Sequence, residues 1–257
     1  MAKIYFFGTC SGTEPIEGRQ HLAFAIEVNG AYYWFDAGEN CSRTAYLMGV
    51  ELMKIKAIFI SHTHMDHIGG LGNLLWNIRK LTTLGPQRPS GKKIEVYIPN
   101  MTVWSALLEI LKNTEGGFEC DFDIAAGEVR DGTVYRDENI TVTAFHNHHL
   151  PVGGDGKWKS YSYLIEADGK KIVFSGDVRD VYDLDRIIGG GCDVLMMETG
   201  HHKIDDIKNY TDEKNIRRLL LVHHGREILN DRQSVSAKLR HFKCDSLICD
   251  DKTVLDI

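Results

Sequence analysis

The stretch FISHTHMDHIGG, residues 59–70, places three histidines and one aspartate within six positions, directly after a short apolar run. On an α-helix His62, His64, Asp66 and His67 would point in several directions, which excludes the arrangement in which two histidine ligands share one helix face. In an extended segment that turns, such side chains converge, and the two glycines at the end allow a tight turn. Neutral imidazoles with a carboxylate suit zinc or a similar divalent ion. The stretch therefore predicts a metal site.

The sequence on both sides of this stretch alternates strands with helices. Apolar and β-branched runs predict strands at residues 3–9, 22–28, 31–37, 56–62, 93–99, 139–145, 192–198, 217–223, 245–250 and 253–257, and a strand pair within 160–176. Asn29-Gly30 predicts a hairpin turn. Helical periodicity predicts helices at 70–85, at 101–113 after an Asn100 cap, at 181–190 and in the segment after Thr211. One α/β domain over residues 1–257, with helices covering its sheets, is the expected organisation.

Composition and charge narrow the class of protein. The formal net charge of −6, with no long basic run, argues against a nucleic-acid binder that depends on a broad positive face. No apolar run approaches the roughly 20 residues of a membrane span. The six cysteines are scattered and form no CxxC pair, a pattern typical of reduced thiols. A cytoplasmic protein without a membrane segment is expected.

Further candidate ligands follow other predicted strands. Because strand ends at the carboxyl edge of open α/β sheets form ligand crevices, these residues are expected near the first stretch. They are His146, His148 and His149 in AFHNHHLP, Asp177 in FSGDV, His223 and His224 in LLLVHHGR, and Asp36 in WFDAGE.

Six segments in this order resemble the metallo-β-lactamase superfamily, and within it the branch of ribonuclease Z and related phosphodiesterases. The resemblance runs over almost the whole chain, and it implies a four-layer αβ/βα sandwich with a two-metal site at its edge. The segments are FFGTCSGTEP, WFDAGE, FISHTHMDHIGGL, NHHLP, FSGDV and LVHH.

The resemblance also implies the ligands of the first metal. His62 and His64 match two of them, and a histidine of NHHLP matches the third. We expect this third ligand to be His149, because the family's histidine directly precedes the turn into the next strand. His148 is the alternative.

The second metal, by the same resemblance, is held by Asp66, His67 and a histidine of LVHH. His223, which directly follows the apolar strand, is the expected ligand. Asp177 is expected to bridge the two ions. Asp36 is expected to support the site without binding metal.

The chemistry implied is hydrolysis by a metal-bridging hydroxide, since two divalent ions lower the pKa of a shared water. Zinc is the expected metal, and manganese or iron also accept this ligand set. Asp66 is expected to act additionally as general base or orienting group. Glu198, in METGHH, is a candidate for proton transfer or support, with His201 or His202 as leaving-group acid. The alternative for Glu198 is a solvated turn in which it caps the following segment.

The substrate expected from the resemblance is a phosphodiester. Two departures argue against processing of transfer RNA: only 27 residues separate His149 from Asp177, too few for an RNA-clamping arm, and no His-Ser-Thr motif is present. A small or cyclic phosphodiester or a short oligonucleotide fits better. The alternatives are a hydrolase of carboxylic esters, sulfate esters or lactones, and a non-catalytic metal-dependent sensor. Because relatives often dimerise, a homodimer is also expected.

Overall fold

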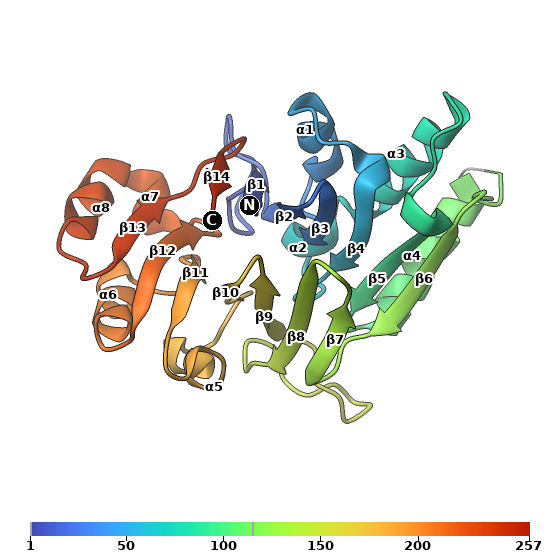
Figure 1. Ribbon diagram of the computed structural model, residues 1–257. Helices are drawn as coiled ribbons and strands as arrows, with labels where there is room; N and C mark the ends of the chain where they lie inside the picture. Colours follow the sequence, from blue (N-terminus) through green and yellow to red (C-terminus); the bar gives the residue numbers. More distant parts are fainter. Residues whose placement is uncertain (1, 115) are drawn as a thin grey trace.

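The computed structural model describes residues 2–114 and 116–257, which form two seven-stranded sheets packed face to face (Figure 1). The first sheet has the order β14-β1-β2-β3-β4-β5-β6. Its strands are β1 (Lys3–Gly8), β2 (Ala23–Val28), β3 (Ala31–Phe35), β4 (Ile55–Phe59), β5 (Lys93–Ile98), β6 (Asp123–Glu128) and β14 (Val254–Asp256). Strand β14 pairs with β1, so the two ends of the chain lie side by side.

The second sheet has the order β13-β12-β11-β10-β9-β8-β7. Its strands are β7 (Gly132–Arg136), β8 (Ile140–His146), β9 (Tyr161–Ala167), β10 (Lys170–Phe174), β11 (Cys192–Glu198), β12 (Ile216–Val222) and β13 (Asp245–Ile248). In each sheet one run of strands is parallel, β3 to β6 in the first and β10 to β13 in the second.

Helices cover the outer face of each sheet, which confirms the predicted four-layer αβ/βα sandwich. In the first half these are α1 (Cys41–Leu47), η1 (Leu52–Lys54), α2 (Met65–Ile68), α3 (Leu71–Thr83), η2 (Ser90–Lys92) and α4 (Met101–Thr114). In the second half they are η3 (Val181–Leu184), α5 (Asp185–Ile188), α6 (Ile204–Asp212), α7 (Arg226–Asn230) and α8 (Arg232–Leu239). None of the helices described is both long and apolar enough to cross a membrane.

The core between the sheets is aromatic. Phe24 of the first sheet stacks on Phe35, with ring centroids 5.1 Å apart, and meets Phe174 of the second sheet edge-on at 4.9 Å. All three side chains are fully buried. Burying a phenylalanine contributes about 1.5–3 kcal/mol. The alternating inward positions of the strands thus fix the two sheets to each other.

Several local predictions are confirmed and one is wrong. The hairpin forms at Asn29 and Gly30, which both have positive φ, and Asn100 caps α4 by accepting hydrogen bonds from the backbone N–H groups of Thr102 and Val103. The helix expected after Thr211 instead ends at Asp212 and β12 begins four residues later. Elements α1, α2, β6, β7, α7 and α8 were not expected, and α2 places Asp66 and His67 on a short helix rather than in an extended segment.

The parallel strands position the site. Asp36 follows β3 and His62 follows β4 in one sheet, whereas Asp177 follows β10 and His223 follows β12 in the other. Carboxyl ends of parallel strands meet at the same edge. Because the sheets face each other, the two edges bring these side chains together.

Candidate metal centre

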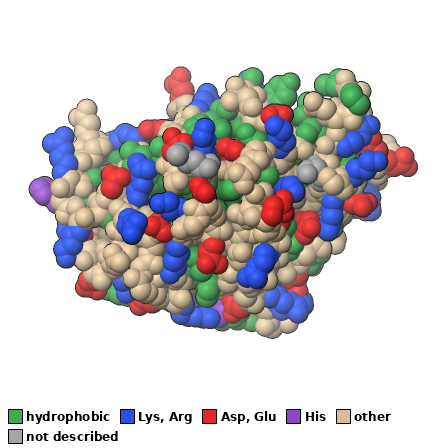
Figure 2. All heavy atoms as spheres, viewed as in Figure 1, with side chains coloured by type: hydrophobic (Ala, Val, Ile, Leu, Met, Phe, Trp, Pro, Cys, Tyr) green, Lys and Arg blue, Asp and Glu red, His purple; other side chains and the backbone are tan. Residues whose placement is uncertain are grey.

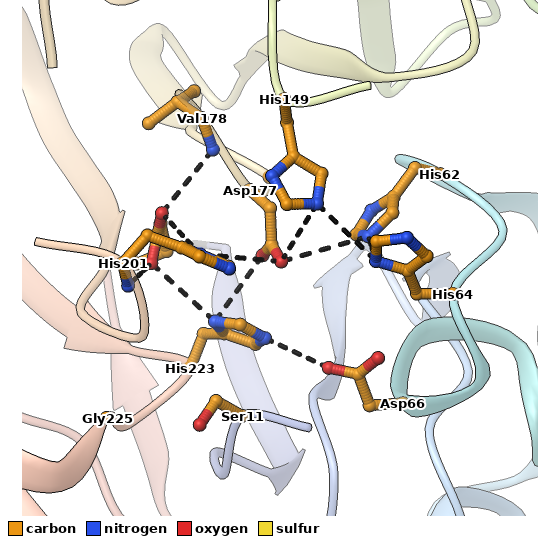
Figure 3. Close-up of polar contacts among 12 residues, drawn as sticks. Ser11, His62, His64, Asp66, His149, Asp177, Val178, His201, His223 and Gly225 are labelled. Atoms are coloured by element: carbon orange, nitrogen blue, oxygen red, sulfur yellow. Dashed lines mark hydrogen bonds and ion pairs between the residues drawn. The ribbon is translucent and has the colours of Figure 1, made fainter. Parts of the chain in front are cut away.

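His62, His64 and His149 form a first ligand group (Figure 3). Nε2 of fully buried His62 lies 3.0 Å from Nδ1 of His64, and Nε2 of His149 lies 3.4 Å from the same atom. Burial lowers the pKa of both His62 and His149. These two imidazoles are therefore neutral at pH 7, which is the form that binds metal.

Asp66, His67 and His223 form a second ligand group. Oδ2 of Asp66 lies 3.1 Å from Nε2 of His223 and 3.3 Å from Nε2 of His67, and those two nitrogens are 3.2 Å apart. Burial alone would raise the pKa of Asp66, but hydrogen bonds from His223 and His67 outweigh burial and bring the pKa below its usual value. The group therefore contains a carboxylate at neutral pH.

Asp177 lies between the two groups. Its Oδ2 is 3.7 Å from Nε2 of His62 and 3.8 Å from Nε2 of His149. Its Oδ1 is 3.4 Å from Nε2 of His67 and 3.4 Å from Nδ1 of His223. One carboxylate thus presents one oxygen to each group, as a ligand shared by two ions would do.

The cluster fits divalent cations. Oδ1 of Asp177 and Nδ1 of His223 are buried without a hydrogen-bond partner, although buried polar atoms are normally paired. Burial would lower the pKa of His223, but Asp177 and Asp66 raise it to about 9. The pKa of His67 is raised against burial in the same way, by Asp177 and Asp36. The carboxylates therefore favour positive charge here, and the donor set is one that divalent metal ions accept.

Asp36 supports this cluster from behind. Its fully buried carboxylate accepts hydrogen bonds from Nδ1 of His67 at 2.7 Å and from the hydroxyl and backbone N–H of Ser61 at 2.8 and 2.7 Å. Asp36 and His223 both have left-handed backbones, with φ of 51° and 50°. Such residues cost about 1–3 kcal/mol each and persist where surrounding contacts fix them. Asp36 thereby orients His67 so that Nε2 faces Asp66.

The other candidate histidines lie outside the two groups. Nδ1 of His148 pairs with Asp183 at 2.5 Å, and its side chain is 54% exposed. His146 pairs with Asp131, and buried His224 contacts the carbonyl of Leu221. Of the two neighbours in NHHLP, the structure thus places His149 and not His148 in the cluster.

Glu198, at the end of β11, is fully buried rather than solvated. Its carboxylate lies 3.0 Å from Nδ1 of His201, 3.3 Å from Nε2 of His202 and 3.6 Å from Nδ1 of His223. A hydrogen bond to Glu198 raises the pKa of His201. Glu198 therefore touches the second ligand group and orients His201 from beneath.

A cleft of about 420 Å³ opens over the cluster. Its size suits a small ligand. Gly12 forms part of its wall so close to Asp66 that a Cβ there would come within 2.8 Å of Oδ2, so a larger residue would displace the Asp66 carboxylate. The lining residues are Ser11, Gly12, Thr13, Glu14, His64, Asp66, Asp177, Gly200, His201, His223, Gly225 and Arg226.

The cleft includes residues to which the sequence analysis assigned no role, although they lie in the segments FFGTCSGTEP and LLLVHHGR. The loop of residues 9–14 forms one wall, and it is tied to the loop after β12 because the Ser11 hydroxyl donates to the His224 carbonyl at 2.7 Å and the His224 N–H donates to the Thr9 carbonyl at 2.7 Å. Arg226 stands three residues after His223 on that loop. This short spacing from the expected ligand His223 was the feature of the sequence that could have marked Arg226 as a residue of the site.

Sequence relatives agree with this picture. The ribonuclease Z of Methanothermobacter thermautotrophicus is 34% identical over 149 residues, an alignment that covers 58% of this chain and 45% of that protein. The ribonuclease Z of Archaeoglobus fulgidus is 23% identical over 313 residues, covering 100% of this chain and 98% of that protein. This chain thus spans under half of the first relative and nearly all of the second.

Solved structures share the fold. Human tRNase Z, short form, superposes with a TM-score of 0.71 at 19% identity, covering 99% of both chains. The metallo-β-lactamase fold protein YhfI from Bacillus subtilis gives a TM-score of 0.74 at 16% identity, covering 99% of this chain and 98% of that one.

This chain therefore has the fold of metallo-β-lactamase fold proteins, and its sequence is similar to those of ribonuclease Z proteins. A family model described as "Anti-Pycsar protein Apyc1" matches residues 2–243. The chain belongs to this Apyc1 family.

Proposed function

We propose that this chain is a binuclear metal-dependent phosphodiesterase whose single hydrolase domain spans residues 1–257. The observation that carries the proposal is the position of Asp177, which presents one oxygen to each of two complete ligand groups. Two divalent ions, with zinc as the expected metal and manganese or iron as alternatives, match these donors.

The proposed ligands divide evenly. His62, His64 and His149 would hold one ion with Oδ2 of Asp177. Asp66, His67 and His223 would hold the other with Oδ1. When bound, such a pair supplies Lewis acidity and an activated water at neutral pH.

The side chains around the cleft supply the proton chemistry in this proposal. Asp66 is 13% exposed and lines the cleft, so its carboxylate can orient and accept a proton from an attacking water. His201 also lines the cleft, and because its Nδ1 is engaged by Glu198, its Nε2 remains to protonate the leaving oxygen. Glu198 acts as a positioning residue. The water oxygen bonds to phosphorus as the P–O bond to the leaving oxygen breaks, which gives a phosphomonoester and an alcohol, joined in one molecule when the substrate is cyclic.

The proposed substrate is a small or cyclic phosphodiester or a short oligonucleotide. The ribonuclease Z relatives support a phosphodiester of nucleic-acid type. The cleft of about 420 Å³ supports a small one. Figure 2 shows Lys and Arg side chains interspersed with Asp and Glu over the face in view, without a broad positive patch there. A homodimer stays a prediction, as does a cytoplasmic location, which the six free cysteines support.

The test compares two chromogenic substrates, bis(p-nitrophenyl) phosphate and p-nitrophenyl acetate, on the purified metal-loaded protein. We expect turnover of the phosphodiester, its loss in Asp66→Ala, and unchanged turnover in Asp183→Asn, which alters the contacts of Asp183 with the ring and backbone N–H of His148. Turnover of the acetate alone would instead assign the site to carboxylic esters. Metal binding without turnover of either substrate would favour a sensor.

A further inference from the structure

Arg226 and Glu14 form an ion pair within the cleft. Nη1 of Arg226 donates to Oε1 of Glu14 at 3.0 Å, and Nη2 contacts Oε2, so the contact is bidentate. Arg226 directly follows Gly225, which Figure 3 shows in the part of the site that contains His223 and Ser11. Both charged residues line the same cleft as Asp66 and Asp177.

Arg226 is the only lysine or arginine among the residues that line this cleft. Apart from the carboxylates assigned to metal binding, Glu14 is the only acidic residue there. The guanidinium of Arg226 is therefore the one permanent cation among the lining residues, and the carboxylate of Glu14 is paired with it. Arginine recognises carboxylates and phosphates through the same planar fork of donors.

The ion pair is not needed to hold the two loops together. Buried hydrogen bonds between Ser11 and His224 and between His224 and Thr9 already join them at 2.7 Å. Arg226 and Glu14 are 56% and 63% exposed. Exposed pairs contribute little to stability, so an entering anion exchanges easily with the carboxylate.

We propose that Arg226 binds the phosphodiester anion of the substrate, and that Glu14 is the resident counter-ion which this anion displaces. Arg226 is then a specificity-determining residue, because it favours anionic phosphodiesters over neutral esters that lack a charge to pair with it. Glu14 restrains the strength of that interaction by competing for the same donors.

This inference rests on the proposed function, and binding without turnover tests it separately. The probe is diethyl phosphate, an anionic phosphodiester with poor leaving groups, titrated into the metal-loaded protein by calorimetry. Arg226→Ala should raise its Kd about tenfold, the effect of one charge-assisted hydrogen bond. Arg226→Lys should give an intermediate Kd because it keeps the charge without the fork. Glu14→Gln should lower the Kd about twofold to fivefold, since the competitor is gone.

Two controls separate this role from a structural one. Neutral triethyl phosphate should bind equally to wild type, Arg226→Ala and Glu14→Gln. Asp205→Asn, which breaks the exposed pair with Lys238 outside the cleft, should leave diethyl phosphate binding unchanged. With bis(p-nitrophenyl) phosphate, KM should rise in Arg226→Ala and fall in Glu14→Gln, while kcat changes little.

Opposite shifts for the Arg226 and Glu14 variants support the inference. The inference would be overturned if the Kd of diethyl phosphate shifted in the same direction in both variants or did not shift. It would also be overturned if triethyl phosphate were affected equally, or if wild type bound no diethyl phosphate. Absence of phosphodiester turnover with opposite Kd shifts would instead reject only the proposed function.

Discussion

The two ligand groups of the cluster are built differently. The first consists of three histidines, and His64, which links the other two, is exposed. The second contains Asp66 and two fully buried histidines, one of them held by Asp36. Burial lowers the pKa of His62, whereas carboxylates raise the pKa of His67 and His223.

The two ligand groups therefore differ in how firmly contacts within the protein hold their side chains in place. Hydrogen bonds with Asp66 and Asp36 hold the second group in place, and its carboxylates attract positive charge. The first group has contacts among its own rings and a contact between the Ser61 hydroxyl and Nδ1 of His62, but Asp177 approaches its imidazole nitrogens only to 3.7 and 3.8 Å. We therefore expect the second group to be ordered before an ion binds, and the first group to depend on its ion for order. The predictions below test this asymmetry.

The largest effect is expected for Asp177→Ala, which removes an oxygen from both groups at once. Both proposed ions should be lost or weakened, and phosphodiester turnover should fall on the order of a thousandfold, since metal ions contribute several kcal/mol to the transition state. Metal analysis paired with steady-state kinetics checks this. A variant that keeps two ions and full turnover would show that Asp177 bridges nothing.

A smaller, one-sided effect is expected for His149→Ala. It should release the ion of the first group and leave the other ion bound. Turnover should fall about a hundredfold, because only one ion then stabilises the transition state. The matched control is His148→Ala, whose exposed side chain pairs with Asp183. If His148→Ala lost metal and His149→Ala did not, His148 rather than His149 would be the ligand.

The smallest effect is expected for Asp36→Asn, which weakens the support of His67 without removing a ligand. Loss of such support typically lowers metal affinity about 10–100-fold. The affinity should fall more for the second group, whose His67 contacts Asp36 directly, than for the first, whose His62 reaches Asp36 only through Ser61, as measured by competition with a chromophoric chelator. An equal fall for both groups would contradict the asymmetry.

Much of the fold was predictable because apolar periodicity marks buried strands and helices. The missed elements carry little of that signal. β6 reads DIAAGE, whose Asp, Ala and Gly are poor strand residues, and it forms by pairing with β5. α1 is short and buries Ser42 and Thr44 beside Cys41 and Ala45, so its inward face does not look apolar.

The misplaced helix has a different cause. In α6 the buried residues Ile204, Ile207, Tyr210 and Thr211 do show helical spacing. The predicted boundary was wrong because β12 begins soon after the helix ends, leaving no room for a helix beyond Thr211.

The candidate site was largely visible in the sequence, since its ligand candidates follow strands. The pairing of Arg226 with Glu14 was not predictable, because neither of the two segments that contain them shows that these side chains meet over one cleft. Only the folded loops reveal that contact.

The most direct test of the two-ion centre is a zinc titration of the metal-free protein, followed by both direct metal analysis and hydrolysis of bis(p-nitrophenyl) phosphate. We expect binding to saturate at two zinc ions per chain and turnover to reach its plateau only as the second ion binds. Saturation below one ion per chain, or full turnover with a single ion, would contradict this expectation.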